Sequence, residues 1–224
     1  MQLYRKPEDL PAEIPVFPLR GVILLPRSTL PLNVFEPRYI ALINDALAGS
    51  RLVGIVQPDT SAGEEESPAG STVPLRSIGS VGRITAFQET DDGRILVTLT
   101  GVARYRIMSE RGSTAPYRVC KVDFTPYAAD FEQGAGESAV NRKRLLRVLR
   151  NYLQAHDLNA DWDSINRSSN ELLVNTLSVI SPYGPEEKQA LLEAIDLKAR
   201  SEVLIALAEM DLAARDGGAG GTVQ

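Results

Sequence analysis

A serine and a histidine are the side chains of this sequence that come nearest to a catalytic pattern. Ser61 stands in the segment 60–63, Thr-Ser-Ala-Gly, and His156, the only histidine, is followed by Asp157. A serine nucleophile needs a positioned base, whereas Ser61 lies in an acidic stretch rich in small residues. Stabilisation of a helix C-terminus accounts for His156 without any chemistry. We therefore predict no catalytic residue and a protein that is not an enzyme.

Metal and nucleotide chemistry find equally little support. One cysteine, Cys120, and one histidine cannot supply a Cys/His zinc site, and the Glu run at 64–66 is typical of a solvated loop. The sequence contains no Gly-x-x-x-x-Gly-Lys-[Ser/Thr], the loop whose amides hold ATP phosphates. We expect no cofactor and no metal.

The same composition bears on location. A single cysteine allows no internal disulfide, which favours a reducing compartment. No apolar run approaches the roughly 18 residues of a membrane span, and the N-terminus lacks the apolar core of a signal peptide. We expect a cytoplasmic protein without a membrane partner.

One dense basic stretch invites a binding interpretation. It contains Arg142, Lys143, Arg144, Arg147 and Arg150, of which Lys143, Arg147 and Arg150 share a helical face opposite the leucines. This face is either a contact surface for nucleic acid or an acidic partner, or it is a solvated helix face or a dock for the acidic remainder of the protein. The net charge of −5 gives no general attraction to nucleic acid, so we favour the solvated face.

The elements that must carry these residues fall into two halves. Residues 1–127 read as short strands with many prolines, residues 138–214 as helices, and residues 215–224 as a disordered tail. The segment 127–137, with two glycines, reads as the linker.

In the first half we predict strands at 14–19, 30–34, 52–56, 105–108 and 118–124, and a hairpin of 81–87 with 94–100. Asp92-Gly93 supplies the hairpin turn. The prolines of 14–19 indicate an edge strand or an irregular strand, because proline donates no ladder hydrogen bond. A helix begins at Pro37 and ends at Gly49.

In the second half we predict four helices. They span 141–155, 168–181, a segment beginning at Pro185 and a segment beginning after Asp196. Ser168-x-x-Glu171 has the spacing of a capping box at the start of the second helix.

Taken in order, the motifs of this chain resemble the N-terminal substrate-binding domain of Lon proteases. The segments that carry the resemblance are 14–20 (Ile-Pro-Val-Phe-Pro-Leu-Arg) with Leu25-Pro26, 31–39 (Pro-Leu-Asn-Val-Phe-Glu-Pro-Arg-Tyr), 78–84 (Ile-Gly-Ser-Val-Gly-Arg-Ile), Asp92-Gly93, 101–105 (Gly-Val-Ala-Arg-Tyr), Ser181-Pro182 and 188–193 (Lys-Gln-Ala-Leu-Leu-Glu). Together these segments cover nearly the whole chain. The Thr-Ser-Ala-Gly of 60–63 also echoes the nucleophile segment of the Lon peptidase domain, which we interpret as coincidence.

The resemblance implies an α+β fold: a PUA-like, partly open β-barrel followed by a C-terminal α-helical bundle. It further implies a non-catalytic module that binds unfolded or degron-bearing polypeptides, as an adaptor or holdase associated with an ATP-dependent protease. RNA binding is the alternative, because true PUA domains bind RNA, although we do not expect nucleic acid as the partner.

The family motif supplies residues whose role we expect to be structural. They are Glu36, Pro37, Arg38, Tyr39, Gly79, Gly82, Gly101 and Arg104. We expect Arg38 to pair with a nearby carboxylate at the helix start and the glycines to permit tight turns or close strand approach. On this basis Arg38→Ala should cost about 1–3 kcal/mol of stability.

Overall fold

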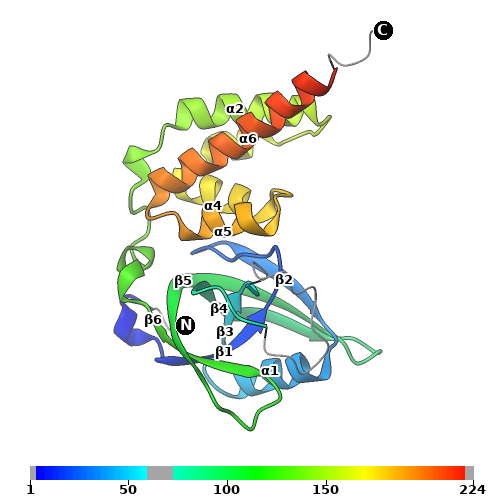
Figure 1. Cartoon of the computed structure of the whole chain (residues 1–224), viewed down its shortest axis with the longest axis vertical. Helices are drawn as coiled ribbons and strands as arrows, with labels where there is room; N and C mark the ends of the chain where they lie inside the picture. Colours follow the sequence, from blue (N-terminus) through cyan, green and yellow to red (C-terminus); the bar gives the residue numbers. More distant parts are fainter. Residues whose placement is uncertain (1–3, 60–72, 220–224) are drawn as a thin grey trace.

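The chain folds into a β-barrel with a set of helices on one side of it (Figure 1). The computed structural model describes residues 4–59 and 73–219. The strands are β1 (Glu13–Pro18), β2 (Thr29–Val34), β3 (Leu52–Val56), β4 (Ile78–Glu89), β5 (Ile95–Arg111) and β6 (Arg118–Asp123). The helices are α1 (Pro37–Ala48), α2 (Arg142–Ala155), α3 (Trp162–Arg167), α4 (Asn170–Ile180), α5 (Pro185–Glu193) and α6 (Leu197–Ala219). The predicted α+β class is confirmed.

The strands are hydrogen-bonded in the order β2-β5-β4-β3-β1-β6, and β5 also pairs with β6. The ring of strands therefore closes through β5, and β2 is added beside the first half of that strand. All pairings are antiparallel except that of β1 with β3. The predicted hairpin is confirmed as β4 and β5 joined at Asp92-Gly93, and it projects from the side of the barrel in Figure 1.

Of the two alternatives for the proline-containing first strand, the edge position is wrong. β1 lies between β3 and β6, but its two partners scarcely overlap along it. β6 pairs with residues 13–16 and β3 with residues 16–18, so Val16 alone faces both strands. Pro15 and Pro18 each adjoin a single ladder, which leaves room for a residue that donates no hydrogen bond.

The strands predicted at 94–100 and 105–108 form one 17-residue strand, β5. Gly101 lies at its middle, where the connection between β1 and β2 crosses the strand closely. A Cβ at this position would lie 2.0 Å from the carbonyl oxygen of Leu25. The N–H of Arg27 donates to the Gly101 carbonyl at 2.9 Å, and the Gly101 N–H donates to Ser28 at the same distance. The glycine thus lets this connection lie against β5, beneath the helical half.

Helix α1 begins at Pro37, as predicted, and Gly49 follows its last residue. Its buried face, which includes Tyr39, Leu42 and Ile43, packs into the barrel core. Figure 1 places α1 on the side of the barrel away from the other helices.

The helical half contains the four predicted helices, observed as α2, α4, α5 and α6, together with α3, which the sequence did not predict. The capping box expected at Ser168 is wrong. Ser169 is the N-cap of α4 and accepts from the N–H of Leu172, whereas Ser168 ends α3 and donates to the Ser164 carbonyl. Helix α6 continues to Ala219, past the start of the expected tail at 215, and residues 220–224 lie outside the described part.

The expected linker is a packed segment. Residues 125–131 form two short 3₁₀ turns separated by a kink at Tyr127, with Tyr127 and Asp130 buried, and a further 3₁₀ turn covers Glu137–Ala139. The core of the helical half also includes Ile23 and Leu25 from the β1–β2 connection. Barrel and bundle therefore share a continuous contact. In the described residues no helix is both long and apolar enough to cross a membrane.

Candidate functional site

An apolar groove of ≈ 160 Å³ lies within the helical half. It is bounded by α2, α4, α6 and the turn that follows α4. Its walls are almost entirely aliphatic and aromatic, and include Leu145, Leu149, Leu153, Leu177, Leu204 and Ala208. The leucines of α2 recur every three or four residues, so that one face of the helix lines the groove. Such a groove can bind apolar side chains.

Two large apolar side chains at the groove are open to solvent. Leu158, in the turn after α2, is 53% exposed, and Ile180, the last residue of α4, is 68% exposed. Tyr183 also lines the groove, and burial raises the pKa of its hydroxyl to about 12. An exposed aliphatic edge beside an apolar groove is typical of a surface that binds other apolar groups.

The open end of the groove is fixed by polar contacts between helices. Pro182 stops α4, and Lys188 of α5 donates from Nζ to the carbonyls of Ser178 (2.8 Å) and Val179 (2.6 Å), which are among the last of that helix. His156, at the end of α2, lies 2.6 Å from the Asp211 carboxylate of α6. The first two bonds join α4 to α5, and the third joins α2 to α6.

A buried ion pair joins the barrel to the segment that leads into the helices. Arg104 of β5 donates from Nε to Oδ2 of Asp130 (2.9 Å) and from Nη2 to Oδ1 (2.8 Å). Both residues are less than 10% exposed. The remaining nitrogen, Nη1, donates to the carbonyls of Leu192 (3.1 Å) and Ala194 (2.5 Å) at the end of α5. One arginine thus connects barrel, linker and bundle.

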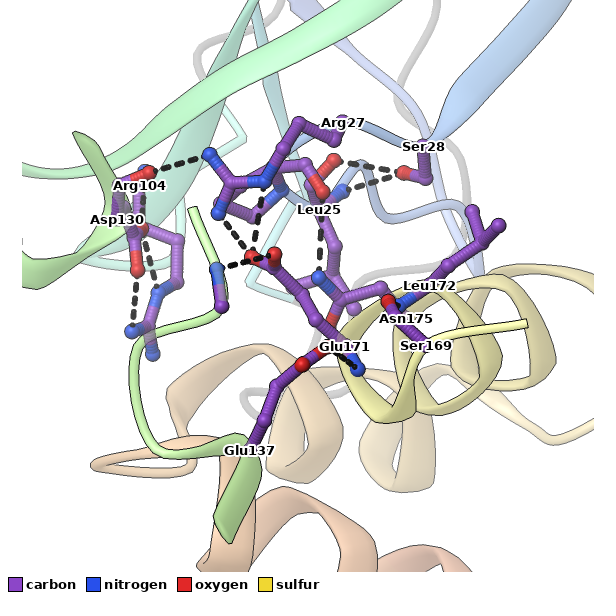
Figure 2. A network of polar contacts seen from close by, with 12 residues as sticks. Leu25, Arg27, Ser28, Arg104, Asp130, Glu137, Ser169, Glu171, Leu172 and Asn175 are labelled. Carbon is purple, nitrogen blue, oxygen red and sulfur yellow. Dashed lines mark hydrogen bonds and ion pairs between the residues drawn. The ribbon is translucent and has the colours of Figure 1, made fainter. Parts of the chain in front are cut away.

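A second ion pair lies beside the first (Figure 2). Arg27, held at a φ of +64° in the β1–β2 connection, donates from Nε to Oε1 of Glu171 at 2.9 Å and from Nη1 to the Asp130 carbonyl at 2.9 Å. The other oxygen of Glu171 accepts from the N–H of Gly134 at 2.9 Å. Asn175, one turn further along α4, donates to the Pro26 carbonyl. The network orients α4, and with it one wall of the groove, relative to the barrel.

The residues of the 36–39 motif lie far from this interface, at the start of α1. Arg38 donates from Nε to the Glu36 carboxylate at 2.9 Å, and both side chains are about two-fifths exposed. The Arg38 guanidinium lies 4.6 Å from the centre of the Tyr39 ring, which stacks on Phe17. Pro37 is the first residue of the helix. None of the four residues lines the groove.

The other motif residues lie within the barrel. Gly79 and Gly82 are in β4, Gly101 is in β5, and a Cβ on Gly79 would come within 2.6 Å of the Ile55 carbonyl oxygen. Arg104 is the one predicted site residue that the structure places in the barrel–bundle interface. Its partner Asp130, together with Glu171 and the whole groove, was missed. The Leu-rich spacing of helices 141–155 and 168–181 was the only signal for the groove.

Three of the five cations in the basic stretch of α2 contact other side chains of the bundle. Arg142 donates to the Asn170 side chain, Arg144 pairs with Glu209 at 2.9 Å, and Arg150 stacks over Trp162 at 4.7 Å. Lys143 and Arg147 remain exposed. Arg144 and Arg150 are exposed as well, so the stretch keeps positive charge at the surface although three of its five cations have a partner within the bundle.

The residues first considered for chemistry form no site within the part of the chain that the structure describes. Ser61 and the Glu run at 64–66 lie outside the described residues. His156 pairs with Asp211 rather than with its neighbour Asp157, and Cys120 is fully buried. Within the described ranges no three His, Cys, Asp or Glu side chains are grouped to hold a metal ion.

Comparison with known proteins gives a consistent result. Residues 13–209 match the family described as the ATP-dependent protease La (LON) substrate-binding domain. Lon protease 2 of Myxococcus xanthus is 31% identical over 203 residues, covering 89% of this chain and 24% of that protein. The Lon protease of Anaeromyxobacter dehalogenans is 28% identical, with 89% and 23% covered. The chain spans about a quarter of the length of these curated relatives.

Two solved structures have the same fold. The N-terminal domain of the Mycobacterium avium complex Lon protease superposes with a TM-score of 0.64 at 22% identity, over 88% of this chain and 98% of that one. A Lon N-terminal domain protein from Xanthomonas campestris gives a TM-score of 0.54 at 22% identity, over 87% and 97%. At this identity the likeness concerns the fold.

Proposed function

The chain belongs to the family of ATP-dependent protease La (LON) substrate-binding domains, and from this premise we propose that it is a non-catalytic module that binds exposed apolar segments of polypeptides. The observation that carries the proposal is the apolar groove between α2, α4 and α6, with Leu158 and Ile180 exposed beside it. Unfolded proteins differ from folded ones in offering contiguous apolar side chains. A groove with aliphatic walls recognises that difference without reading a sequence.

The chemistry of the groove favours this ligand class over others. Its polar groups are few, namely the hydroxyls of Ser181 and the tyrosines, so it supplies no pairing for a phosphate or a base. None of the basic residues of α2 lines the groove, so a phosphate bound there would meet no positive charge from this helix. The resemblance to a substrate-binding domain supports the same conclusion.

We further propose that the module presents the bound chain to an ATP-dependent protease. The support is that the curated relatives are Lon proteases, in which the matching region is about a quarter of the protein. An adaptor should accelerate degradation of an unfolded substrate by a Lon protease, whereas a holdase without a protease partner should slow it. Slowing of degradation would therefore contradict the adaptor role and leave the binding role intact.

Binding itself is tested with a charge in the groove. A fluorescent, reduced and carboxymethylated protein, which stays unfolded in buffer, is titrated with the wild type and with Ile180→Glu. Losing the burial of one isoleucine should weaken binding by roughly tenfold to a hundredfold. Met210→Glu is the matched control, because Met210 is also 68% exposed and lies on α6 outside the groove lining.

The control should bind within about twofold of the wild type, since its side chain does not reach the groove. Equal losses in the two variants would show that binding is not located in the groove. No binding by the wild type would contradict the proposed function.

A further inference from the structure

The apolar groove of the helical half ends in a buried apolar floor. The lining side chains that lie deepest are at most 8% exposed, and they are Leu145, Val148, Leu204, Ile205 and Ala208. None of the lining side chains carries a charge, and the polar ones are a serine and two tyrosines. A polar or charged group pushed to the floor would lose its water without gaining a hydrogen-bond partner there. The floor therefore favours an apolar group.

The volume of the groove limits how much of a polypeptide it can hold. At ≈ 160 Å³ it is close to an engineered protein cavity of about 150 Å³, with aliphatic and aromatic walls, that binds benzene. A phenyl ring or a leucine side chain is of this size. In an extended chain the next side chain on the same face lies two residues away, at roughly 7 Å, and so beyond the ring that fills the space. The groove has room for one large side chain.

From this volume and this floor, we propose that the groove holds a single side chain of the bound polypeptide, of the size of phenylalanine or leucine. The inference rests on the proposed function and states how the groove reads its ligand. Leu158 and Ile180, exposed at the groove, contact the residues beside this anchor. Several apolar residues in an unfolded segment then raise the chance that one of them enters the groove, without adding their burial to one another.

The number of anchors is counted with soluble host peptides of about twelve glycine and serine residues with blocked ends. One version carries one phenylalanine, one carries three of them at every third position, and the reference carries alanine. Binding to the full chain is followed by the shifts of its methyl NMR signals. The single phenylalanine should bind at least about tenfold more tightly than alanine, because most of a ring is buried. Three phenylalanines should add no more than about a statistical factor of three, since the rings cannot engage one site together.

Size selection is tested by enlarging the groove. Leu149→Ala removes part of the wall formed by α2, and a host peptide with one tryptophan should gain at least about threefold on the phenylalanine peptide relative to the wild type. Leu146→Ala is the matched control, because Leu146 is also half-buried on α2 but does not line the groove. Its ratio of the two affinities should stay within about 1.5-fold of the wild-type ratio. Comparing two peptides on one variant removes a general loss of stability from the result.

An affinity that rises about tenfold with each added phenylalanine would overturn the proposal, because several side chains would then be bound at once. The proposal would equally fall if the tryptophan-to-phenylalanine ratio changed alike, or not at all, in Leu149→Ala and Leu146→Ala, or if the peptide with one phenylalanine did not bind. In each of these cases an unfolded protein still binds the wild type more tightly than Ile180→Glu if the proposed function holds. Failure of the single anchor is therefore distinguishable from failure of polypeptide binding.

Discussion

Two arginines of the family motif show how the environment of a side chain determines its contribution to stability. Arg104 is buried with all of its guanidinium nitrogens engaged, whereas Arg38 is about two-fifths exposed and pairs with Glu36 across two positions. Breaking a buried ion pair leaves an uncompensated charge in the interior, while an exposed pair gains little over water. In the sequence, both arginines are identified only as members of the family motif. Their difference depends on Asp130, which lies 26 residues from Arg104 along the chain.

We therefore predict that Arg104→Ala destabilises the fold by about 3–5 kcal/mol and that Arg38→Ala costs less than about 1 kcal/mol. The exposure of Arg38 lowers the cost expected from its motif position alone. Urea unfolding of both variants and the wild type measures the difference. Equal costs would contradict the assignment of Arg104 as the residue that connects the two halves.

Cys120 gives a prediction for the dependence of stability on pH. Burial in the barrel, with a smaller effect of Glu110, raises the pKa of its thiol to about 11. The folded chain keeps this proton over an interval in which the unfolded chain, with a thiol pKa of about 8.5, loses it. The contribution of the protonated Cys120 thiol to the free energy of unfolding is therefore fully present below about pH 8.5. It is lost as the pH rises to about 11, by up to about 1.4 kcal/mol per pH unit.

The measurement is the free energy of unfolding at intervals from pH 8 to pH 11. Cys120→Ala should be less stable at pH 8, but its stability should fall less steeply with pH because it lacks the thiol that ionises first in the unfolded chain. If the free energy of unfolding fell in parallel with pH for the two proteins, Cys120 would not contribute to the pH dependence of stability.

At the scale of elements, local signals predicted most of the secondary structure. Pro37 and Gly49 bound α1, and Asp92-Gly93 marks the β4–β5 hairpin, because proline and glycine act through the backbone geometry of their own position. Helix α3 was missed because it has six residues and little apolar periodicity. What fixes its start is the Asp161 side chain, which accepts from the Ser164 N–H at 3.0 Å.

One of two neighbouring serines caps the start of α4. Ser169 accepts from Leu172 N–H at 3.2 Å, and Glu137, from the preceding segment, accepts from the Glu171 N–H at 2.8 Å. Glu171 matched the expected capping box by spacing, but its carboxylate is held by Arg27 instead. Sequence spacing could not show this, because Arg27 and Glu171 are 144 residues apart.

Ser169→Ala should accordingly cost about 1 kcal/mol, the usual loss for an N-cap. Ser168→Ala removes only an exposed bond to the Ser164 carbonyl and should stay within about 0.5 kcal/mol of the wild type. Thermal unfolding of the two single variants distinguishes the adjacent positions. A larger loss at Ser168 would mean that the capping box forms in solution.

At the scale of the molecule, the two halves are joined by apolar packing as well as by ion pairs. Ile23 and Leu25 of the β1–β2 connection lie in the core of the helical half, and Arg104 bonds to the end of α5. The Leu-rich spacing of residues 141–155 and 168–181 indicates apolar helix faces that other elements must cover. It could not predict the groove, because a groove is the space left by the relative placement of α2, α4 and α6.

We predict that a chain truncated after Tyr127 melts lower than the full chain and is less soluble. Truncation exposes Ile23 and Leu25 and removes Asp130, the ion-pair partner of Arg104. A chain truncated after Arg215 is the control and should melt like the full chain. If the barrel alone retained its full melting temperature, the halves would be independent domains.

The central claim is that the apolar groove of the helical half binds unfolded polypeptide. Isothermal titration calorimetry with a reduced, carboxymethylated protein, at three temperatures and two salt concentrations, tests it most directly. Binding through apolar burial has a negative heat-capacity change and changes little between low and moderate salt. We predict both results for the wild type and weaker binding for Ile180→Glu. Binding that weakens steeply with salt, has no heat-capacity change and is unaffected by Ile180→Glu would contradict the account.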